Sequence, residues 1–338
     1  MQKTAVTETD KTGAFARTDS IHRNYVGDEA FPPELKRYLL ICAYACPWAH
    51  RCLIVRSLYG LENCIPIAVV HPTWEKTGDD GHSGWVFKSP NDPPVVHPST
   101  MTTIPCDENC HPPPCEYLWK SVRSIYEAST GGNCGKDVKF TVPILWDMKN
   151  DTIVNNESSE IIRMFSNPQL LGQFATKNQH LNLRPKKHIH TIDTINAWIY
   201  EQVNNGVYKC GFSKTQQAYD VAAKELEDGL NKVERLLETS RFLCTNDSIT
   251  EADVRLFPTL IRHDEVYCVY FKTNHVPIIN NMQQFPNINR YMKDMMCINE
   301  IRSTVKMKHI KYHYYTSHPT LNPYGIIPKG NNVIKSLL

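Results

Sequence analysis

The residue in this sequence that is best placed to act as a reactive group is Cys46, which stands directly before Pro47 in the stretch LLICAYACPWAHRCLIV. The preceding run, residues 37–45, is apolar and aromatic over about one strand length, and proline is favoured in the first helical turn. Cys46 is therefore predicted to begin a helix that follows a strand. The free N–H groups at a helix start stabilise a thiolate, the nucleophilic form of cysteine, and His50 and Arg51 would add positive charge nearby.

A single thiol is predicted at this turn, because position 49 is an alanine and a thioredoxin-type Cys-x-x-Cys pair is absent. Such a thiol needs an external thiol to resolve any mixed disulfide that it forms. The alternative is that Cys46 is one buried thiol without a chemical role among twelve cysteines. In a long chain without a signal peptide these cysteines indicate free thiols and a reducing, cytoplasmic compartment.

Two further stretches offer surfaces that complement the thiol. In TVPILWD, Val142 precedes a proline, and a cis bond there would expose the Val142 backbone for strand-like pairing with a peptide. In NNESSE, Glu157 and Ser158 fall at a predicted helix start, which suits an α-carboxylate, although an ordinary helix cap gives the same pattern. A thiol, an extended backbone and an anion site together fit the thiol tripeptide glutathione.

A cysteine-rich loop raises the question of a metal site, because Cys106, Cys110, His111 and Cys115 fall within ten residues. Zinc signatures carry a second, distant pair of ligands, and no such pair is present here. The sequence therefore predicts a solvated loop and no metal.

The elements around Cys46 form a mixed α/β arrangement. Apolar runs at 37–45 and 65–70 with a helix between them predict a β-α-β unit, and the Pro-, Gly- and His-rich stretch 71–115 predicts a long loop or insertion. Residues 139–156 predict a hairpin with a Met-Lys-Asn-Asp turn. One helix is predicted before this hairpin, and another is predicted after it, through ESSEIIRMF.

The second half of the chain is predicted to be helical. Apolar residues at helical spacing run from Ile192 to Ile199 and from Ala222 to Leu237, and Thr250 with Asp253 forms a capping box that begins another helix. The predicted organisation comprises an N-terminal extension (1–35), an α/β domain (36–170) with an insertion near 76–117, an all-helical domain (185–318) and a C-terminal tail (319–338).

Composition excludes several functional classes. The chain has 338 residues, 41% of them hydrophobic, and 37 basic residues nearly balance 35 acidic ones. A formal net charge of +2 gives no field that favours nucleic acid or an anionic membrane, and no apolar run is long enough to span a bilayer. We expect neither a nucleic-acid nor a membrane partner.

Taken together, these stretches resemble the glutathionyl-hydroquinone reductases, the Xi class of glutathione transferases, which are related to the Omega class. The resemblance covers nearly the whole chain. It implies a thioredoxin-like N-terminal domain, an all-helical C-terminal domain of the glutathione transferase type, and Cys46 as nucleophile. Its carriers are GAFART, CPWAHRCLIVRSLYGLE, VVHP, GWVF, TVPILWD, TIVNNESSEIIRMF, NAWIYEQVNNGVYKCGF, ITEADVRLFPTLIRHDEVY and HIKYHYYTSHPTLNPYGIIP.

The resemblance also implies which residues hold glutathione. Trp85 of GWVF, Val142 before a cis-proline, and Glu157 with Ser158 match the glutathione-binding motifs. Lys139 stands where relatives commonly carry an arginine, and a lysine keeps the charge but not the two-pronged hydrogen-bonding fork. The segment EKTGDDGHS enlarges the gap between VVHP and GWVF, and the loop after GWVF is richer in proline and cysteine than in the family, which would alter access to the site.

Three tyrosines match the family's acceptor site: Tyr208 of NNGVYK, Tyr267 of DEVY and Tyr314 of KYHYY. Tyr314 is the least certain match, because Tyr312 and Tyr315 stand beside it. A phenol can donate a proton to a leaving group and hydrogen-bond a thiolate. Without the motifs, each of these would be read as a packing residue among 16 tyrosines.

The implied activity is removal of glutathione from glutathionyl-hydroquinones through a Cys46–glutathione mixed disulfide that a second glutathione resolves. Two alternatives stay open: an Omega-like thioltransferase or dehydroascorbate reductase, and a non-catalytic ligand-binding protein. The resemblance further implies a homodimer whose ligands are glutathione and aromatic glutathione conjugates.

Overall fold

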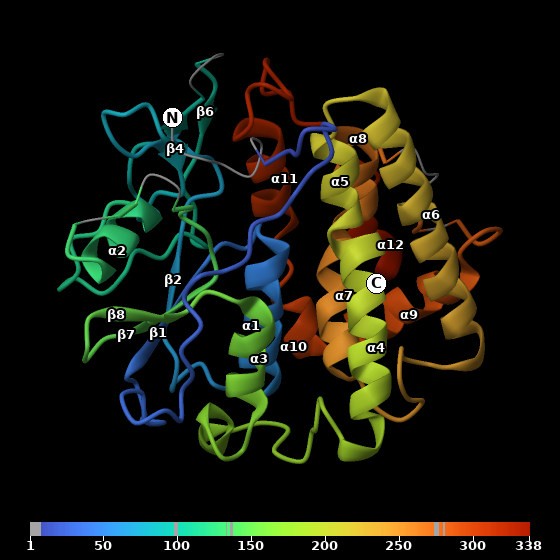
Figure 1. The fold of residues 1–338 in the computed structure, drawn as a ribbon, viewed down its shortest axis with the longest axis horizontal. Helices are drawn as coiled ribbons and strands as arrows, with labels where there is room; N and C mark the ends of the chain where they lie inside the picture. The colour runs from blue at the N-terminus through green and yellow to red at the C-terminus, as the bar shows by residue number, and fades with distance from the viewer. Residues whose placement is uncertain (1–7, 98–100, 133, 136–137, 274–276, 280) are drawn as a thin grey trace. The chain divides into compact units, whose positions relative to one another are not determined.

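The computed structural model describes residues 8–97, 101–132, 134–135, 138–273, 277–279 and 281–338. It divides into two compact units (Figure 1). Unit 1 comprises Asp19–Gln179 and Thr304–Ile327. Unit 2 joins the described residues up to Thr18 with His180–Ser303 and Pro328–Leu338.

Unit 1 is built on a four-stranded sheet of order β2-β1-β7-β8. Strand β1 pairs parallel with β2 and antiparallel with β7, and β7 forms an antiparallel hairpin with β8. The predicted β-α-β opening and hairpin are confirmed. The bounds are β1 Tyr38–Cys42, α1 Pro47–Leu58, β2 Ile67–Val69, α2 Val122–Ser129, β7 Ile144–Asp147, β8 Thr152–Asn155 and α3 Ser158–Ser166.

Both faces of this sheet are covered by helices, as Figure 1 shows, with α1 and α3 packed together on one side and α2 on the other. Every residue of β1 is buried, which explains its unbroken apolar sequence YLLIC. A buried ion pair joins the two central strands, because the Arg37 guanidinium donates to both carboxylate oxygens of Asp147 at 2.9 and 2.6 Å. The ion pair therefore ties the start of β1 to the end of β7.

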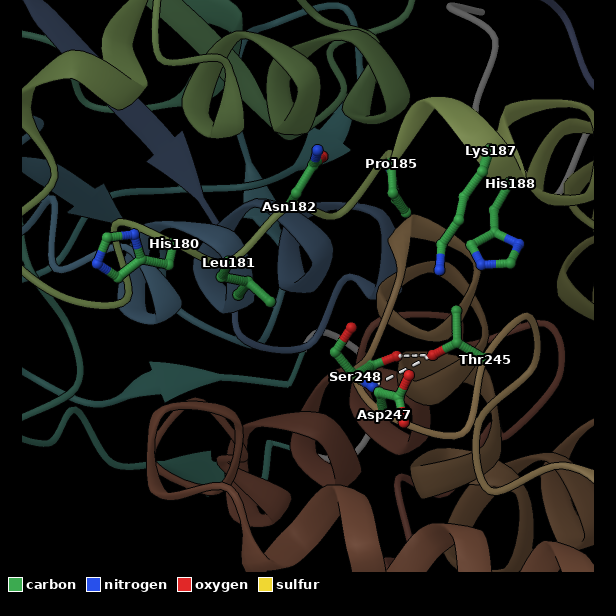
Figure 2. Close-up of a pocket in the computed structure, with 9 residues that line it drawn as sticks. All are labelled: His180, Leu181, Asn182, Pro185, Lys187, His188, Thr245, Asp247 and Ser248. Atoms are coloured by element: carbon green, nitrogen blue, oxygen red, sulfur yellow. Dashed lines mark hydrogen bonds between the residues drawn. The ribbon is translucent and has the colours of Figure 1, made fainter.

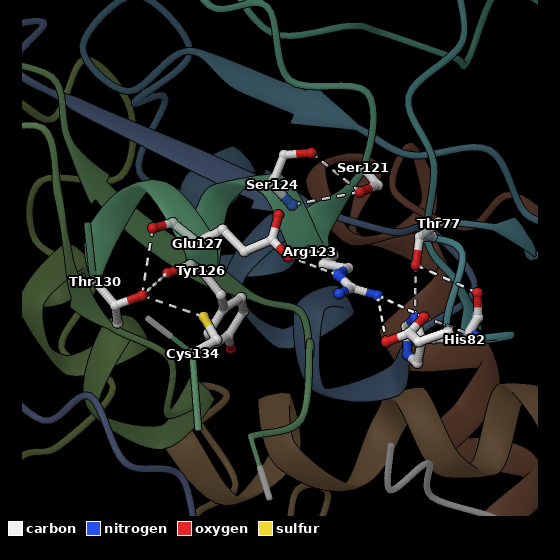
Figure 3. A network of polar contacts seen from close by, with 10 residues as sticks. Thr77, His82, Ser121, Arg123, Ser124, Tyr126, Glu127, Thr130 and Cys134 are labelled. Atoms are coloured by element: carbon white, nitrogen blue, oxygen red, sulfur yellow. Dashed lines mark hydrogen bonds and ion pairs between the residues drawn. The ribbon is translucent and has the colours of Figure 1, made fainter. Parts of the chain in front are cut away.

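The described residues of the proline-rich insertion form only two-residue strands, as its composition predicted. These are β3 Glu75–Lys76, β4 Ser83–Gly84, β5 Val95–Val96 and β6 Thr103–Ile104, which form two small hairpins. Arg123 of α2 anchors the first of them, with its guanidinium 2.8 Å from Asp80 and 2.7 Å from Glu127 (Figure 3). In the same network the Thr77 hydroxyl lies 2.6 Å from His82 Nδ1.

A helix from near the C-terminal end of the chain, α11 (Met307–Thr316), belongs to unit 1. The hydroxyls of Thr73 and Thr316 lie 2.8 Å apart, and Ser317 Oγ accepts the Trp74 N–H at 3.1 Å. The contiguous ranges expected from the sequence place residues 304–318 in the helical domain, whereas the structure groups them with the sheet.

Unit 2 is a bundle of helices, in which α4 packs on α7 and α6 packs on α5 and α9. The capping box predicted at the start of α7 is present, with both Thr250 and Asp253 side chains bonded to backbone donors. The bounds are α4 Ile189–Ile199, α5 Gly206–Phe212, α6 Gln216–Thr239, α7 Glu251–Arg262, α8 Cys268–Tyr270, α9 Pro286–Cys297, α10 Asn299–Arg302 and α12 Val333–Leu337.

Short wider or tighter helical turns interrupt the regular helices. Two π-helical turns, Tyr200–Asn204 and His263–Tyr267, follow α4 and α7, and 3-10 turns span Leu171–Phe174 and Lys186–His188. Nothing in the apolar spacing of the sequence predicted the π-helical turns. Among the described residues, no helix combines the length and apolar character needed to cross a membrane.

Candidate active site

Cys46 lies at the junction of β1 and α1, as predicted. It is the N-cap of α1 with extended backbone dihedrals, and Pro47 is the first helical residue. The side chain is mostly buried, and its sulfur donates to the Val142 carbonyl oxygen at 3.3 Å. The Val142–Pro143 peptide bond is cis, in agreement with the sequence-based expectation. The fold thus brings together the thiol and the extended backbone that the sequence predicted separately.

All twelve cysteines are free thiols, which confirms the prediction against a disulfide framework. Those nearest Cys46 in the chain are deeply buried. Burial raises the pKa of the Cys42 thiol to about 12 and raises that of Cys52 well above its ordinary value. These two neighbours are therefore protonated at neutral pH and are not nucleophiles.

Glu157 and Ser158 lie at the start of α3, as expected. Glu157 is the N-cap, and its carboxylate accepts the Ser159 N–H at 2.9 Å. Burial opposes its ionisation, but hydrogen bonds from Ser159 and Ser20 and the positive charge of Arg51 outweigh burial, so the pKa of Glu157 lies below its ordinary value. A partly buried carboxylate stays ionised here and presents a negative charge.

The two basic residues that follow Cys46 have contacts that the sequence did not indicate. His50 is fully buried, with Nε2 2.8 Å from the Thr304 hydroxyl. Arg51 donates to Ser158 Oγ at 3.4 Å and so links α1 to the start of α3. Neither of these contacts involves Cys46, and no local pattern could have predicted them because each joins distant segments.

Trp85 lies in an aromatic cluster of unit 1. Its ring stacks on His313 of α11 with centroids 4.3 Å apart, and Trp74 meets it edge-on at 5.7 Å. Tyr314, on the same helix, is buried and lies edge-on to His313. Lys139 is half-buried in the segment just before the cis peptide.

Tyr208 and Tyr267 come together in unit 2. Their rings lie 6.1 Å apart, and both pack on Phe271, which stacks nearly parallel to Tyr267 at 5.5 Å. Each tyrosine adjoins a π-helical turn, because α5 begins two residues after Asn204 and Tyr267 ends the second turn. Such turns occur frequently at functional sites.

The N-terminal segment supplies two residues at Tyr208 that the sequence reasoning did not assign. Phe15 stacks on the Tyr208 ring at 6.4 Å, and the Arg17 guanidinium lies 5.1 Å from its centroid. Arg17 is held there because its Nε donates to Asn205 Oδ1 at 2.9 Å. In the sequence, the motif GAFART, which contains both residues, was the only indication that they contribute to the site.

Comparisons with known proteins match both parts of the chain. Residues 45–167 match the family described as "Glutathione S-transferase, N-terminal domain" and residues 216–294 match "Glutathione S-transferase, C-terminal domain". The chain is 39% identical to glutathione S-transferase omega-like 2 of Schizosaccharomyces pombe, covering 98% of this chain and 97% of that protein. It is 37% identical to glutathionyl-hydroquinone reductase PcpF of Sphingobium chlorophenolicum, covering 94% of this chain and 90% of that protein.

A solved structure is similar to this chain over nearly its whole length. The crystal structure of the Xi glutathione transferase ECM4 from Saccharomyces cerevisiae in complex with glutathione has a TM-score of 0.83 and 31% identity, covering 96% of this chain and 99% of that one. The chain belongs to the Xi class of glutathione transferases. Membership confirms the predicted family, the predicted enzyme class, and the fold of a thioredoxin-like domain followed by a helical domain.

In this Xi-class chain the crowded loop cysteines do not gather around one point. Instead, Cys110 lies with Asp107 and His309, their ligand-type atoms all within 4.8 Å. The Asp107 carboxylate is 2.8 Å from His309 Nε2 and 3.3 Å from Lys308 Nζ, contacts that bind α11 to the insertion.

The chain also carries a surface pocket in unit 2, shown in Figure 2. It lies between the chain around the 3-10 turn at 186–188 and the loop before α7, in which Thr245 and Ser248 are hydrogen-bonded. None of its lining residues is a predicted site residue. They are His180, Leu181, Asn182, Pro185, Lys187, His188, Thr245, Asp247 and Ser248.

Proposed function

We propose that this chain is a glutathione-dependent reductase that removes glutathione from glutathionyl-hydroquinones. The observation that carries the proposal is the placement of Cys46, a lone thiol at the N-cap of α1 with its sulfur 3.3 Å from the Val142 carbonyl. A relative covering 94% of the chain is named for this activity, which supports the same assignment.

The proposed reaction has two steps. The Cys46 thiolate attacks the sulfur of the conjugate, a sulfur–sulfur bond forms, and the sulfur–carbon bond breaks with its electron pair passing to the ring carbon. That carbon takes a proton from the phenol of Tyr208, and hydroquinone leaves. A second glutathione then attacks the mixed disulfide, so that glutathione disulfide leaves and the Cys46 thiolate is restored.

Unit 1 offers groups that complement glutathione. The ionised Glu157 carboxylate attracts the tripeptide's ammonium group, and the hydroxyl and N–H of Ser158 at the start of α3 suit its α-carboxylate. The Val142 backbone beside the sulfur suits pairing with the cysteinyl peptide groups. We propose that Trp85 and Lys139 complete this glutathione site, and that Tyr208, Tyr267 and Tyr314 line the acceptor site.

The test is to incubate the chain with a glutathionyl-hydroquinone and glutathione and to measure hydroquinone by chromatography. We expect release by the wild type and by Cys297→Ala, which removes an exposed thiol, and no release by Cys46→Ala. Mass spectrometry should show one glutathione on Cys46 when the second glutathione is withheld. Undiminished release by Cys46→Ala would overturn the proposal.

An Omega-like thioltransferase or dehydroascorbate reductase is the second candidate, because a relative at 39% identity carries an omega-like name. Both activities share the Cys46–glutathione disulfide, so the first step alone distinguishes them. Comparing kcat/KM on a glutathionyl-hydroquinone with kcat/KM on a small mixed disulfide and on dehydroascorbate decides between the two.

We further propose that the chain acts as a homodimer in the cytoplasm on aromatic glutathione conjugates. Light scattering on the purified chain tests the dimer, because a monomer mass at micromolar concentration would contradict it.

A further inference from the structure

The π-helical turn before α8 brings a second cysteine against a buried histidine. In a regular α-helix, residues five apart do not share a face, whereas a π-helical turn bonds residue i to i+5. Here the turn His263–Tyr267 brings Cys268 Sγ to 3.3 Å from Nδ1 of His263. The widened turn is therefore what makes this contact.

The histidine in this pair is held in its charged form. His263 is fully buried, and its Nδ1 lies 3.0 Å from Asp264 Oδ1. The Asp264 carboxylate is itself fixed, because it accepts the backbone N–H groups of Ile278 and Ile279 at 2.8 Å each. Burial disfavours the imidazolium, but the hydrogen bonds with Asp264 and Cys268 outweigh burial and raise the pKa of His263 to about 9.

Cys268 combines this cationic neighbour with partial exposure to solvent. Reactive cysteines lie in electropositive, partly exposed surroundings, since a nearby positive charge favours the thiolate. The other unit 2 cysteines differ from Cys268 in burial or in their charged neighbour. Burial raises the pKa of Cys210 to about 12 and of Cys244 to about 11, while Cys297 is exposed and lies near the charge of Arg241.

We propose that Cys268 is a second reactive thiol of this protein, activated by His263 and modified by glutathione disulfide. The Cys268 thiolate attacks one sulfur of the disulfide, a Cys268–glutathione bond forms, the disulfide bond breaks, and the departing glutathione thiolate takes a proton from solvent. Free glutathione reverses the step. The modified residue directly follows Tyr267, so oxidised glutathione would place a tripeptide beside the tyrosine cluster. This inference does not depend on the reaction at Cys46.

The experiment uses full-length Cys46→Ala, so that the first thiol cannot react, with glutathione disulfide added at neutral pH. Peptide mapping by mass spectrometry follows each adduct with time. We expect Cys268 to be modified about tenfold faster than Cys115 and Cys297, which are more exposed but lack the histidine. Equal or faster modification of these two thiols would overturn the proposal, because exposure alone would then explain reactivity.

A second variant tests the role of His263 as a positioning residue. In Cys46→Ala/His263→Gln the charge is lost, and we expect adduct formation at Cys268 to slow about tenfold while Cys297 is unaffected. The groups facing the imidazole are Asp264 and Cys268. An undiminished rate of adduct formation at Cys268 in this variant would overturn the assignment.

The same three side chains have the chemical types of a metal site, with their ligand-type atoms within 4.8 Å of one another. Zinc bound there would block the thiol. Metal analysis of the purified chain, with and without a chelator, decides this point. Adduct formation without chelator supports the proposal, whereas tightly held zinc whose removal is required for modification would overturn it.

Discussion

At the scale of single residues, Glu157 has two tasks that substitutions can separate. Its carboxylate caps α3 by accepting the Ser159 N–H, and its ionised charge is available to a ligand ammonium group. In Glu157→Gln the amide oxygen can still cap the helix, so we expect an about tenfold higher KM for glutathione with stability nearly unchanged. Steady-state kinetics and urea unfolding measure the two effects.

The matched variant Glu157→Ala removes the cap as well. We expect it to lower the free energy of unfolding by about 1 kcal/mol, in addition to the same rise in KM. A wild-type KM in Glu157→Gln would show that this charge does not bind glutathione.

Arg17 is predicted to act through Tyr208. In the proposed reaction Tyr208 gives up its proton, and a guanidinium 5.1 Å from the ring centroid would stabilise the resulting phenolate. We expect Arg17→Met, which keeps the length but not the charge, to lower kcat on glutathionyl-hydroquinones several-fold with little change in KM. Arg17→Lys should recover part of the loss, and equal kcat values for Met and Lys would contradict a charge effect.

The sequence predicted the chemistry of single residues best where one local rule sufficed. Cys46 at a helix start, Val142 before a cis bond and Glu157 at a helix start each follow from two or three neighbouring letters. The contacts of Arg51 with Ser158 and of Arg17 with Tyr208 escaped prediction, because they join segments that only the folded chain brings together.

At the scale of elements, alanine substitutions at two glycines of α5 are expected to have opposite effects on stability. A Cβ at Gly211 would lie 2.2 Å from the Phe271 ring, whereas one at Gly206 would meet nothing closer than 3.5 Å, at Leu226. We expect Gly211→Ala to lower the free energy of unfolding by about 1–3 kcal/mol and to disturb the tyrosine cluster. Urea unfolding and near-ultraviolet circular dichroism measure both effects.

Gly206→Ala is the matched control, since it adds the same methyl group to the same helix. Alanine favours helix over glycine, so stability should stay equal or rise by up to about 1 kcal/mol. Similar destabilisation by both substitutions would mean that backbone freedom in α5, and not the Phe271 contact, is decisive.

Regular elements were predictable because their signals are periodic. The apolar spacing from Ala222 to Leu237 marks the buried face of α6, and the capping box locates the start of α7. The π-helical turns were not predictable, because one inserted residue shifts a helical face without changing composition.

At the scale of the whole molecule, buried histidines give unit 1 a characteristic sensitivity to acid. Burial lowers the pKa of His71 and His309 and lowers that of His318 to about 4. Between pH 6.5 and 4 the unfolded chain binds protons that the folded unit rejects, so stability falls as pH falls through this window. Urea unfolding at pH 7 and pH 5 measures the loss.

His318→Gln removes one of these titrations. We expect the decrease in the free energy of unfolding between pH 6.5 and 5 to be smaller by about 2 kcal/mol in this variant. His263 in unit 2 has the opposite sign, because its raised pKa of about 9 gives stability that is complete below pH 6.5 and lost as pH rises toward 9. An unchanged acid response in His318→Gln would contradict the assignment.

Domain boundaries were the least predictable feature at this scale. The loss of periodicity near 168–187 falls at the junction between the units, at Gln179 and His180. No local sequence pattern indicates that Thr304–Ile327 belongs to unit 1, since α11 has the same helical spacing of apolar residues as the helices of unit 2. Tertiary contacts assign it, among them those with Thr73, Trp74 and Asp107.

The packing of Thr304–Ile327 in unit 1 has a consequence for synthesis on the ribosome. The sheet and its first helices leave the exit tunnel long before the segment that packs on Trp74 and Trp85 has been translated. At cellular elongation rates the delay is on the order of ten seconds. During that interval the aromatic surface around Trp74 and Trp85 is not yet covered by α11, and transiently exposed apolar surface of this kind favours aggregation.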